Sequence, residues 1–149
     1  MQYHGPMRSG VLDTDVLVAA LRSDSGASRR VLEAALDGRF KLLLSVPLVL
    51  EYEAVLTRPE HLAACGADRT DVLAVLDALC LIADRVELLI RLRPMSDDPD
   101  DEMVLETAIN GRADAIVTFN RRHFRTAARF RCSVLQPADA LRQLERWSE

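Results

Sequence analysis

Two carboxylates, Asp13 and Asp15, lie in the segment VLDTDVLVAAL, where a short apolar run changes into a helical pattern. Paired acids at such a junction commonly act on phosphate groups, and two chemistries are open. In the first, Asp13 attacks a phosphoryl group and Asp15 donates a proton. In the second, Asp13 binds a metal ion that assists the cleavage of nucleic acid. Asp13 taken alone could also serve only as the N-cap of the following helix.

Three further polar side chains lie close in sequence to predicted strands. Glu51 comes after the apolar run FKLLLS, Asp101 opens the helix that precedes ADAIVTF, and Asn120 follows that strand. Because ligands bind beyond the carboxyl ends of parallel strands, we expect these side chains to converge with Asp13. Converging carboxylates repel one another, and a divalent cation relieves the repulsion; oxygen ligands favour Mg²⁺ or Mn²⁺. Each acid alone also has an ordinary alternative, such as a solvated helix position for Glu51 or a favourable interaction with the helix dipole for Asp101.

The elements that must position these residues alternate between short apolar runs and helical patterns, which predicts a parallel sheet covered by helices. Strands are predicted over residues 9–13, 40–45, 113–119 and 132–135, with a short strand or edge segment over 86–90. Helical patterns cover residues 14–21, 28–37, 48–56, 60–64, 71–83, 101–110 and 137–147. We therefore expect a single α/β domain over 1–149, a three-layer α/β/α sandwich with a central parallel sheet of about five strands. Its core is expected over residues 9–136, after a flexible N-terminal tail at 1–8.

Composition narrows the class of protein. The chain has 149 residues, 49% of them hydrophobic, which is enough to bury a core, and its net charge of −4 does not indicate a general nucleic-acid binder. No run approaches the roughly 18 apolar residues that a membrane span needs, and the polar N-terminus contains no signal core, so we expect a cytoplasmic protein. The three cysteines are scattered without metal-ligand spacing, which predicts neither a disulfide framework nor a zinc site.

The opening segment resembles that of the haloacid-dehalogenase-like phosphotransferases, whose motif is D-x-D-x-T/V-L/V, with a mismatch only at Leu17. Ser45, after FKLLL, would then stand in for the Ser or Thr of their second motif. Those enzymes carry a basic residue, usually lysine, downstream of that position, whereas the only lysine of this chain, Lys41, lies upstream. The helix that carries Glu51 would have no role. A phosphatase using Asp13 and Asp15 is therefore the minor alternative.

Three ordered blocks resemble the PIN-domain family (PilT N-terminus-like), and in particular the VapC-like toxins of bacterial toxin–antitoxin pairs. The family's opening, D-T-N-V-L-V-S-A-L, corresponds to DTDVLVAAL, with Asp15 at the Asn position. Its second block, S-x-x-L-x-x-E-Y-x-x-V-L, corresponds to SVPLVLEYEAVL. Its third, D-P-D-D-x-x-x-L-x-x-A followed by a Gly turn and A-D-x-I-V-T-x-D, corresponds to DPDDEMVLETAINGRADAIVTFN. The resemblance runs from about Val11 to Phe124.

The resemblance implies roles for individual residues. Asp13, Glu51 and Asp101 would be the metal-binding acids, and Asn120 occupies the catalytic position where the family has a fourth acid. Because an amide brings no charge, one source of metal affinity is missing at that position. The residues implied as supporting or compensating groups around the site are Thr118, Asp15, Asp98, Asp100 and Ser45.

The resemblance also implies the activity and the partners. The reaction would be Mg²⁺- or Mn²⁺-dependent hydrolysis of RNA by the toxin of a type II toxin–antitoxin pair, with a cognate antitoxin protein and homodimer formation. Arginines that flank the proposed cleft in sequence would contact RNA phosphates; these are Arg29, Arg30, Arg121, Arg122 and Arg125. The alternative is a PIN-fold protein that binds RNA or an antitoxin with weak or no catalysis, because position 120 is Asn. His123 could hydrogen-bond RNA, but we expect it to be solvated or to cap a helix.

Overall fold

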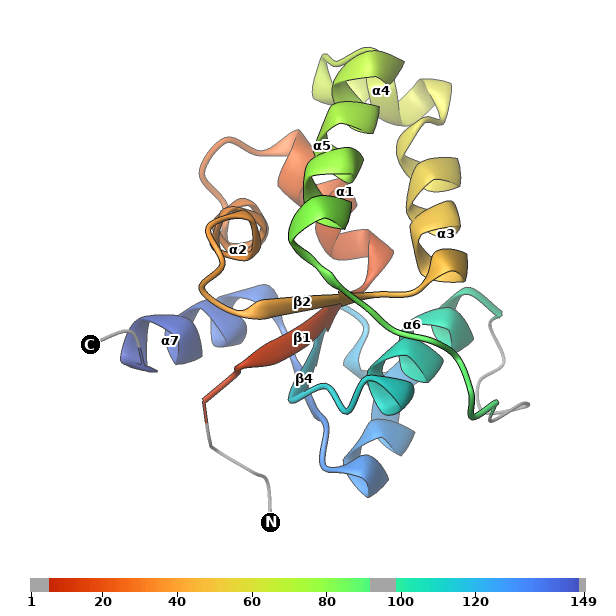
Figure 1. The fold of residues 1–149 in the computed structure, drawn as a ribbon. Helices are drawn as coiled ribbons and strands as arrows, with labels where there is room; N and C mark the ends of the chain where they lie inside the picture. The colour runs from red at the N-terminus through yellow and green to blue at the C-terminus, as the bar shows by residue number, and fades with distance from the viewer. Residues whose placement is uncertain (1–5, 92–98, 148–149) are drawn as a thin grey trace.

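Five parallel strands form one central sheet. The computed structural model describes residues 6–91 and 99–147. The strand order is β3-β2-β1-β4-β5 (Figure 1), and every neighbouring pair is parallel. The strands are β1 (Ser9–Leu12), β2 (Lys41–Leu44), β3 (Asp84–Arg85), β4 (Ala115–Val117) and β5 (Ser133–Leu135). The predicted α/β sandwich with a five-stranded parallel sheet is confirmed.

Helices cover both faces of the sheet. The α-helices are α1 (Thr14–Arg22), α2 (Ala27–Leu36), α3 (Val46–Leu56), α4 (Pro59–Cys65), α5 (Arg69–Ile82), α6 (Pro99–Asn110) and α7 (Pro137–Trp147), and a 3₁₀ segment, η1, covers Arg121–Phe130. The helices α1, α2, α3 and α5 pack against one another on one side, with α7 against α2, whereas α6 and η1 pack together on the other side (Figure 1). In the described ranges, no helix is long and apolar enough to cross a membrane.

Local sequence signals explain where several helices begin and end. Asp13 caps α1, and Ser45 caps α3, whose first turn contains a proline as the pattern predicted. Asp68 and Asp71 form a capping box at the start of α5. The strands that these helices cover are apolar on both faces: the side chains of Val11, Leu12 and their neighbours in β4 are fully buried. This buried centre fixes the positions of the strand ends.

The predicted strand over residues 86–90 was wrong in its position. β3 is Asp84–Arg85, and only the amide of Val86 continues the pairing, donating to the Leu44 carbonyl at 2.8 Å. The amides of Leu89 and Ile90 donate instead to the side-chain oxygen of Asn110 on α6, at 3.0 and 2.7 Å. Because a side chain of α6 satisfies this backbone, the segment leaves the sheet.

The core extends beyond the predicted limits at both ends. Met7 is buried, and the amide of Arg8 donates to the Asp114 carboxylate at 2.9 Å, so the expected tail at residues 1–8 does not include Met7 and Arg8. At the other end, α7 buries Ala140, Leu141 and Leu144, all of them after residue 136. The apolar face of α7 packs on α2, which is the physical reason for the longer core.

Candidate active site

The carboxyl ends of β1 and β4 meet where the connections of the sheet change direction. From β1 the chain proceeds to β2 and β3 on one side, and then crosses to β4 and β5 on the other. Asp13 follows β1 and Thr118 follows β4, and the amide of Asp13 donates to the Val117 carbonyl at 2.9 Å. Such a reversal of strand order leaves a crevice beyond the strand ends, where α/β proteins bind their ligands.

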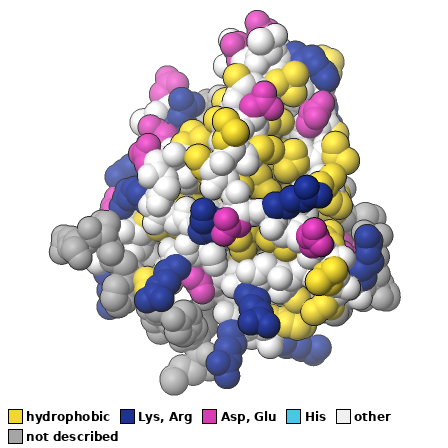
Figure 2. Space-filling view, viewed as in Figure 1, with side chains coloured by type: hydrophobic (Ala, Val, Ile, Leu, Met, Phe, Trp, Pro, Cys, Tyr) yellow, Lys and Arg dark blue, Asp and Glu magenta, His cyan; other side chains and the backbone are white. Residues whose placement is uncertain are grey.

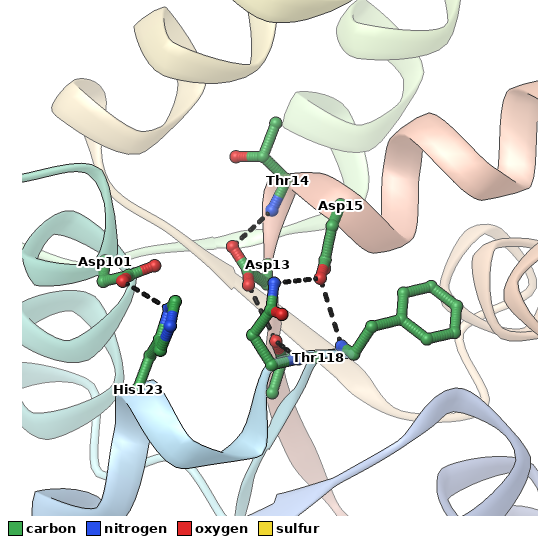
Figure 3. Close-up of polar contacts among 8 residues, drawn as sticks. Asp13, Thr14, Asp15, Asp101, Thr118 and His123 are labelled. Atoms are coloured by element: carbon green, nitrogen blue, oxygen red, sulfur yellow. Dashed lines mark hydrogen bonds and ion pairs between the residues drawn. The ribbon is translucent and has the colours of Figure 1, made fainter. Parts of the chain in front are cut away.

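Asp13 is held by two donors at this crevice. Its Oδ1 accepts a hydrogen bond from the amide of Thr14 at 2.8 Å, and its Oδ2 accepts one from the Thr118 hydroxyl at 2.7 Å (Figure 3). The residue is only 8% exposed. Burial raises the pKa of Asp13, and the two hydrogen bonds oppose that rise without cancelling it. Asp13 is therefore both the predicted N-cap and a desolvated carboxyl group.

Asp15 lies beside Asp13, in the first turn of α1. Its Oδ2 accepts from the amide of Phe119 at 3.2 Å and from the Asn120 side-chain amide at 3.1 Å. Its Oδ1 is buried and has no hydrogen-bond partner among the described residues. Burial, and then the negative charge of Asp13, raise the pKa of Asp15 to about 7. Near neutral pH the pair resists carrying two negative charges, which is the condition that a bound cation relieves.

Tyr52 connects the second predicted block to this crevice. Its side chain is fully buried, and its hydroxyl donates to the carbonyl of Leu12, the residue before Asp13. Burial, and then the charge of Asp13, raise the pKa of Tyr52 well above its usual value, so the hydroxyl stays a donor. Glu51, half-buried on α3, is the neighbouring residue of Tyr52 in the chain. The tyrosine thus fixes the turn of α3 that carries Glu51 against the end of β1.

A second buried bond joins the two helices that carry the other predicted acids. The hydroxyls of Ser45, at the start of α3, and Thr107, on α6, lie 2.7 Å apart. The Thr107 hydroxyl also donates to the Met103 carbonyl at 2.7 Å. Ser45 therefore sets the position of α3 relative to α6.

Asp101 faces His123 across the crevice. The Nδ1 atom of His123 lies 2.8 Å from the Oδ2 atom of Asp101 (Figure 3). Asp101 is buried at the start of α6, whereas half of the His123 side chain is exposed. The amide of His123 also donates to the Asn120 carbonyl at 3.0 Å. His123 is half solvated, in line with the expectation, but its imidazole also contacts a predicted metal-binding acid, which the sequence did not indicate.

Two carboxyl groups at the crevice fit a divalent metal ion. In the part of the chain that the structure describes, no three His, Cys, Asp or Glu side chains are clustered so that they could hold one ion. Mg²⁺ requires only one or two carboxylates, because it keeps several waters and takes the remaining ligands from substrate phosphate. Asp13 and Asp15 supply two desolvated carboxyl groups, one with an unpartnered buried oxygen. These residues fit such an ion, and the joint role of Asp13, Glu51 and Asp101 stays a prediction.

Some predicted residues meet at the site and others do not. Asp13, Asp15, Thr118 and Asn120 form one hydrogen-bonded group. Asp98 and the side chain of Asp100 lie outside the described residues.

Two of the predicted RNA-contact arginines, Arg29 and Arg30, lie on α2 and contact other residues of the protein. Arg30 pairs with Glu145 on α7 at 2.8 Å, and Arg29 lies 4.0 Å from Glu33 and donates to the Ala20 carbonyl. Because α7 starts next to β5 and runs away from its carboxyl end, Glu145 lies roughly 12 Å along the helix from that edge. A contact of Arg29 and Arg30 with RNA phosphates stays a prediction. Arg121, Arg122 and Arg125 are exposed on η1, directly after Asn120.

The position of Lys41 argues against the phosphotransferase alternative, which needs a basic residue near Asp13. Lys41 begins β2, in register with Ser9 at the amino end of β1, and its Nζ lies 3.3 Å from Asp84. It is therefore at the opposite edge of the sheet from Asp13 and cannot balance a phosphorylated Asp13.

Sequence reasoning missed several groups at or near the crevice. Phe119 lies between Thr118 and Asn120 and is 47% exposed, which is unusual for a large aromatic side chain. Glu102 and Glu106 on α6 are buried acids to which no role was assigned. The signal for Phe119 was available, because an aromatic residue just past a buried strand lies at the ligand-binding edge. No periodicity separates Glu102 and Glu106 from solvated helix residues.

Comparison with known proteins agrees with the blocks in the sequence. The family model described as PIN domain matches residues 10–122, which includes β1 to β4 and the first residues of η1. A search of curated proteins gave no significant match.

Proposed function

The chain belongs to the PIN-domain family, whose members are typically metal-dependent nucleases, and from this premise we propose that it is an endoribonuclease that requires Mg²⁺ or Mn²⁺. The observation that carries the proposal is the pair of carboxyl groups at the reversal of strand order, between β1 and β4: Asp13 is buried and Asp15, beside it, is half-buried. Two desolvated carboxyl groups that repel one another at a ligand-binding edge suit a cation and a phosphodiester.

In phosphodiester hydrolysis, the acids of the site would have different roles. A bound Mg²⁺ or Mn²⁺ supplies an activated water and offsets charge on the phosphate oxygens. Asp13 is preorganised for this by Thr14 and Thr118, which fix both of its oxygens. Asp101, oriented by His123, and Glu51, positioned through Tyr52, add negative charge at the same edge. Rigid placement of such groups lowers the cost of reorganisation during the reaction.

An exposed aromatic side chain and exposed arginines support a single-stranded RNA substrate. Phe119 is 47% exposed and its backbone amide donates to Asp15, and unstacked bases of single-stranded RNA stack on exposed aromatic rings. Arg121, Arg122 and Arg125 follow on η1 and are exposed, so they are available to the phosphates. A base on Phe119 would place its own phosphate close to the acids.

The test is cleavage of a single-stranded RNA oligonucleotide with Mg²⁺ or Mn²⁺. Replacing Asp13 by Asn should lower the initial rate by about 100-fold or more, because it removes a charge used in binding the ion and the phosphate. Asp114→Asn is the matched control, since Asp114 lies at the amino end of β4 and its carboxylate accepts hydrogen bonds from the backbone amides of Arg8 and Ser9. Equal rates for the wild type and Asp13→Asn would contradict the proposal.

A second candidate function is RNA or antitoxin binding with weak or no catalysis. Asn120 favours it, because its amide occupies an oxygen of Asp15 and adds no charge to the site. Calorimetric titration separates the two candidates. Binding of RNA without binding of Mg²⁺ or Mn²⁺ at millimolar concentration would favour the binding function.

The order of the three blocks supports the finer proposal of a toxin in a type II toxin–antitoxin pair. Induced expression in bacterial cells should then arrest growth, and Asp13→Asn should relieve the arrest. Co-expression of the product of a neighbouring small gene should relieve it as well. Growth unaffected by the wild-type chain at confirmed expression would contradict the toxin role.

The face formed by α3 and α5 supports the proposal of a protein partner, either a second copy or an antitoxin. Hydrophobic side chains gather over these helices (Figure 2), where Leu50 is 60% and Leu81 is 86% exposed. Between the two helices lies a hollow of about 230 Å³, with Val46, Val49 and Cys80 in its lining. Exposed apolar surface of this kind is typical of an interaction site. Sedimentation of the purified chain at several concentrations tests self-association.

A further inference from the structure

At two facing positions of the site, the acid and the amide are exchanged relative to the PIN-family pattern. That pattern has Asn at position 15 and Asp at position 120, whereas this chain has Asp15 and Asn120. The two side chains are 105 residues apart in sequence and are in direct contact, with the Asn120 Nδ2 donating to the Asp15 Oδ2 at 3.1 Å. In either arrangement, one of the two positions has a carboxylate and the other has an amide of nearly equal shape. Exchanging the two residues would therefore keep the hydrogen-bonded pair and its single negative charge.

The surroundings of the two positions differ in what they leave available. The backbone amide of Phe119 and the side-chain amide of Asn120 both donate to the Oδ2 atom of Asp15, so that oxygen has its partners within the fold. The other oxygen, Oδ1, is buried and has no hydrogen-bond partner in the described ranges. A buried oxygen without a donor is costly unless a ligand satisfies it. Asn120 is itself oriented by the crevice, because its backbone amide donates to the Thr118 hydroxyl at 2.9 Å.

We propose that Asp15 is a metal-binding carboxylate of this chain and that Asn120 holds it in place, so that the charge missing at position 120 is supplied from position 15. The proposal rests on the proposed metal-dependent function and names which residue completes the site. The unpartnered Oδ1 atom would bind the ion, directly or through one of its waters, while the Asn120 amide keeps the Oδ2 atom fixed.

A purely structural role for Asp15 predicts something different. An acid in the first turn of α1 also interacts favourably with the helix dipole. That benefit belongs to position 15 alone and would disappear whenever the residue there becomes Asn. A role in binding the ion belongs to the pair of positions, and should return when the acid is moved across the hydrogen bond to position 120.

The experiment is calorimetric titration of Mn²⁺ into the wild type and variants without RNA. Asp15→Asn keeps an oxygen that accepts from Phe119 and Asn120 and removes only the charge; we expect Mn²⁺ affinity to fall about tenfold or more. Moving the acid, in the double variant Asp15→Asn with Asn120→Asp, should bring the affinity back to within about threefold of the wild type. Asp114→Asn, the same chemical change at the other end of the strands, should leave it unaltered.

The outcomes separate this inference from the proposed function. If the wild type binds Mn²⁺ and Asp13→Asn does not, an Asp15→Asn variant that binds as tightly as the wild type overturns the inference and leaves the function intact. If the Mn²⁺ affinity falls in Asp15→Asn and stays low in the double variant, the claim that an acid at position 120 can replace the acid at position 15 is contradicted. A wild type that binds no Mn²⁺ at millimolar concentration overturns both. Thermal melting of each variant verifies folding, and Asn120→Asp alone, which adds a carboxylate beside Asp15, should raise the affinity.

Discussion

The neighbouring strands β1 and β4 have carboxylates near both edges of the pair, Asp114 at the amino ends and Asp13 and Asp15 at the carboxyl ends, and the two edges differ in how those carboxylates are satisfied. At the amino ends, Asp114 accepts from the amides of Arg8 and Ser9 at 2.9 and 3.1 Å, and its own amide donates to the Ser9 hydroxyl. At the carboxyl ends, Asp13 and Asp15 are close enough for the charge of Asp13 to raise the pKa of Asp15.

The comparison shows how one strand pair can serve stability at one edge and chemistry at the other. Asp114 is a single acid with backbone donors, an arrangement that stabilises the folded state without a ligand. Asp13 and Asp15 share a desolvated space in which two charges repel. Their repulsion costs stability in the protein alone and becomes useful when a cation binds.

The largest effect expected from this comparison is a lower rate of RNA cleavage in the Asp101→Asn variant. Because the substitution removes a charge from the carboxyl edge and leaves the shape of the side chain, the initial rate on single-stranded RNA should fall about 100-fold. The same change at Asp114 should keep the rate within about threefold. Comparable losses for the two variants, measured below their melting temperatures, would remove the functional distinction between the edges.

Hydroxyl removal compares the two edges in stability. Tyr52→Phe leaves the Leu12 carbonyl without its buried donor, and the free energy of unfolding should fall by about 1–3 kcal/mol. Ser9→Ala removes a part-buried acceptor at the amino edge, where water can replace it, and should cost less, about 1 kcal/mol or below. Urea denaturation measures both. A smaller loss for Tyr52→Phe than for Ser9→Ala would show that the tyrosine does not fix the site.

The stability of the metal-free protein should depend on pH through Asp15. Its pKa of about 7 in the folded state is above the usual 3.8, so the folded chain binds the proton more tightly than the unfolded chain. The contribution of Asp15 to the free energy of unfolding is therefore fully present at low pH and is lost as pH rises from about 4 to about 7. After allowance for partial solvent screening, the loss is on the order of 1 kcal/mol.

Melting temperatures in a metal chelator, from pH 5 to pH 8, measure this dependence. The wild type should melt a few degrees lower at pH 8 than at pH 5, and Asp15→Asn should reduce that difference. Asp114→Asn should keep the wild-type difference. A wild-type stability that rises with pH over this range would contradict the repulsion between Asp13 and Asp15.

The smallest expected effect concerns the arginines of η1. Replacing Arg121 and Arg122 by Ala should weaken RNA binding severalfold and lower the salt dependence of affinity by roughly 0.7 per lost phosphate contact. Arg30→Ala should change neither, because Arg30 pairs with Glu145 on α7. Fluorescence anisotropy with single-stranded RNA in a metal chelator measures both. A stronger effect from Arg30→Ala would place the RNA on another face of the molecule.

The sequence predicted elements well where short-range signals agree. The cap at Asp13 and the buried run of β1 follow from residue type and pattern alone. Gly38, directly after the helical pattern of residues 28–37, has the positive φ of 73° that favours glycine. Gly111 follows the helical pattern of residues 101–110 in the same way, but Arg112 adopts the positive φ. An added Cβ at Gly111 would meet Val86 and Leu43 at 2.8 and 2.9 Å. That requirement for close packing arises only when the elements assemble.

The sequence by itself determined that acids stand near the strands of a PIN-like α/β chain, because apolar runs, caps and the three blocks are local patterns. Only the tertiary structure decided which of them act on one another. It brought Asp15 to Asn120 and His123 to Asp101, and it paired Arg30 with Glu145 and Lys41 with Asp84. The physical reason is the strand order: placing β4 beside β1 joins residues about 105 positions apart, and no local pattern encodes that neighbour.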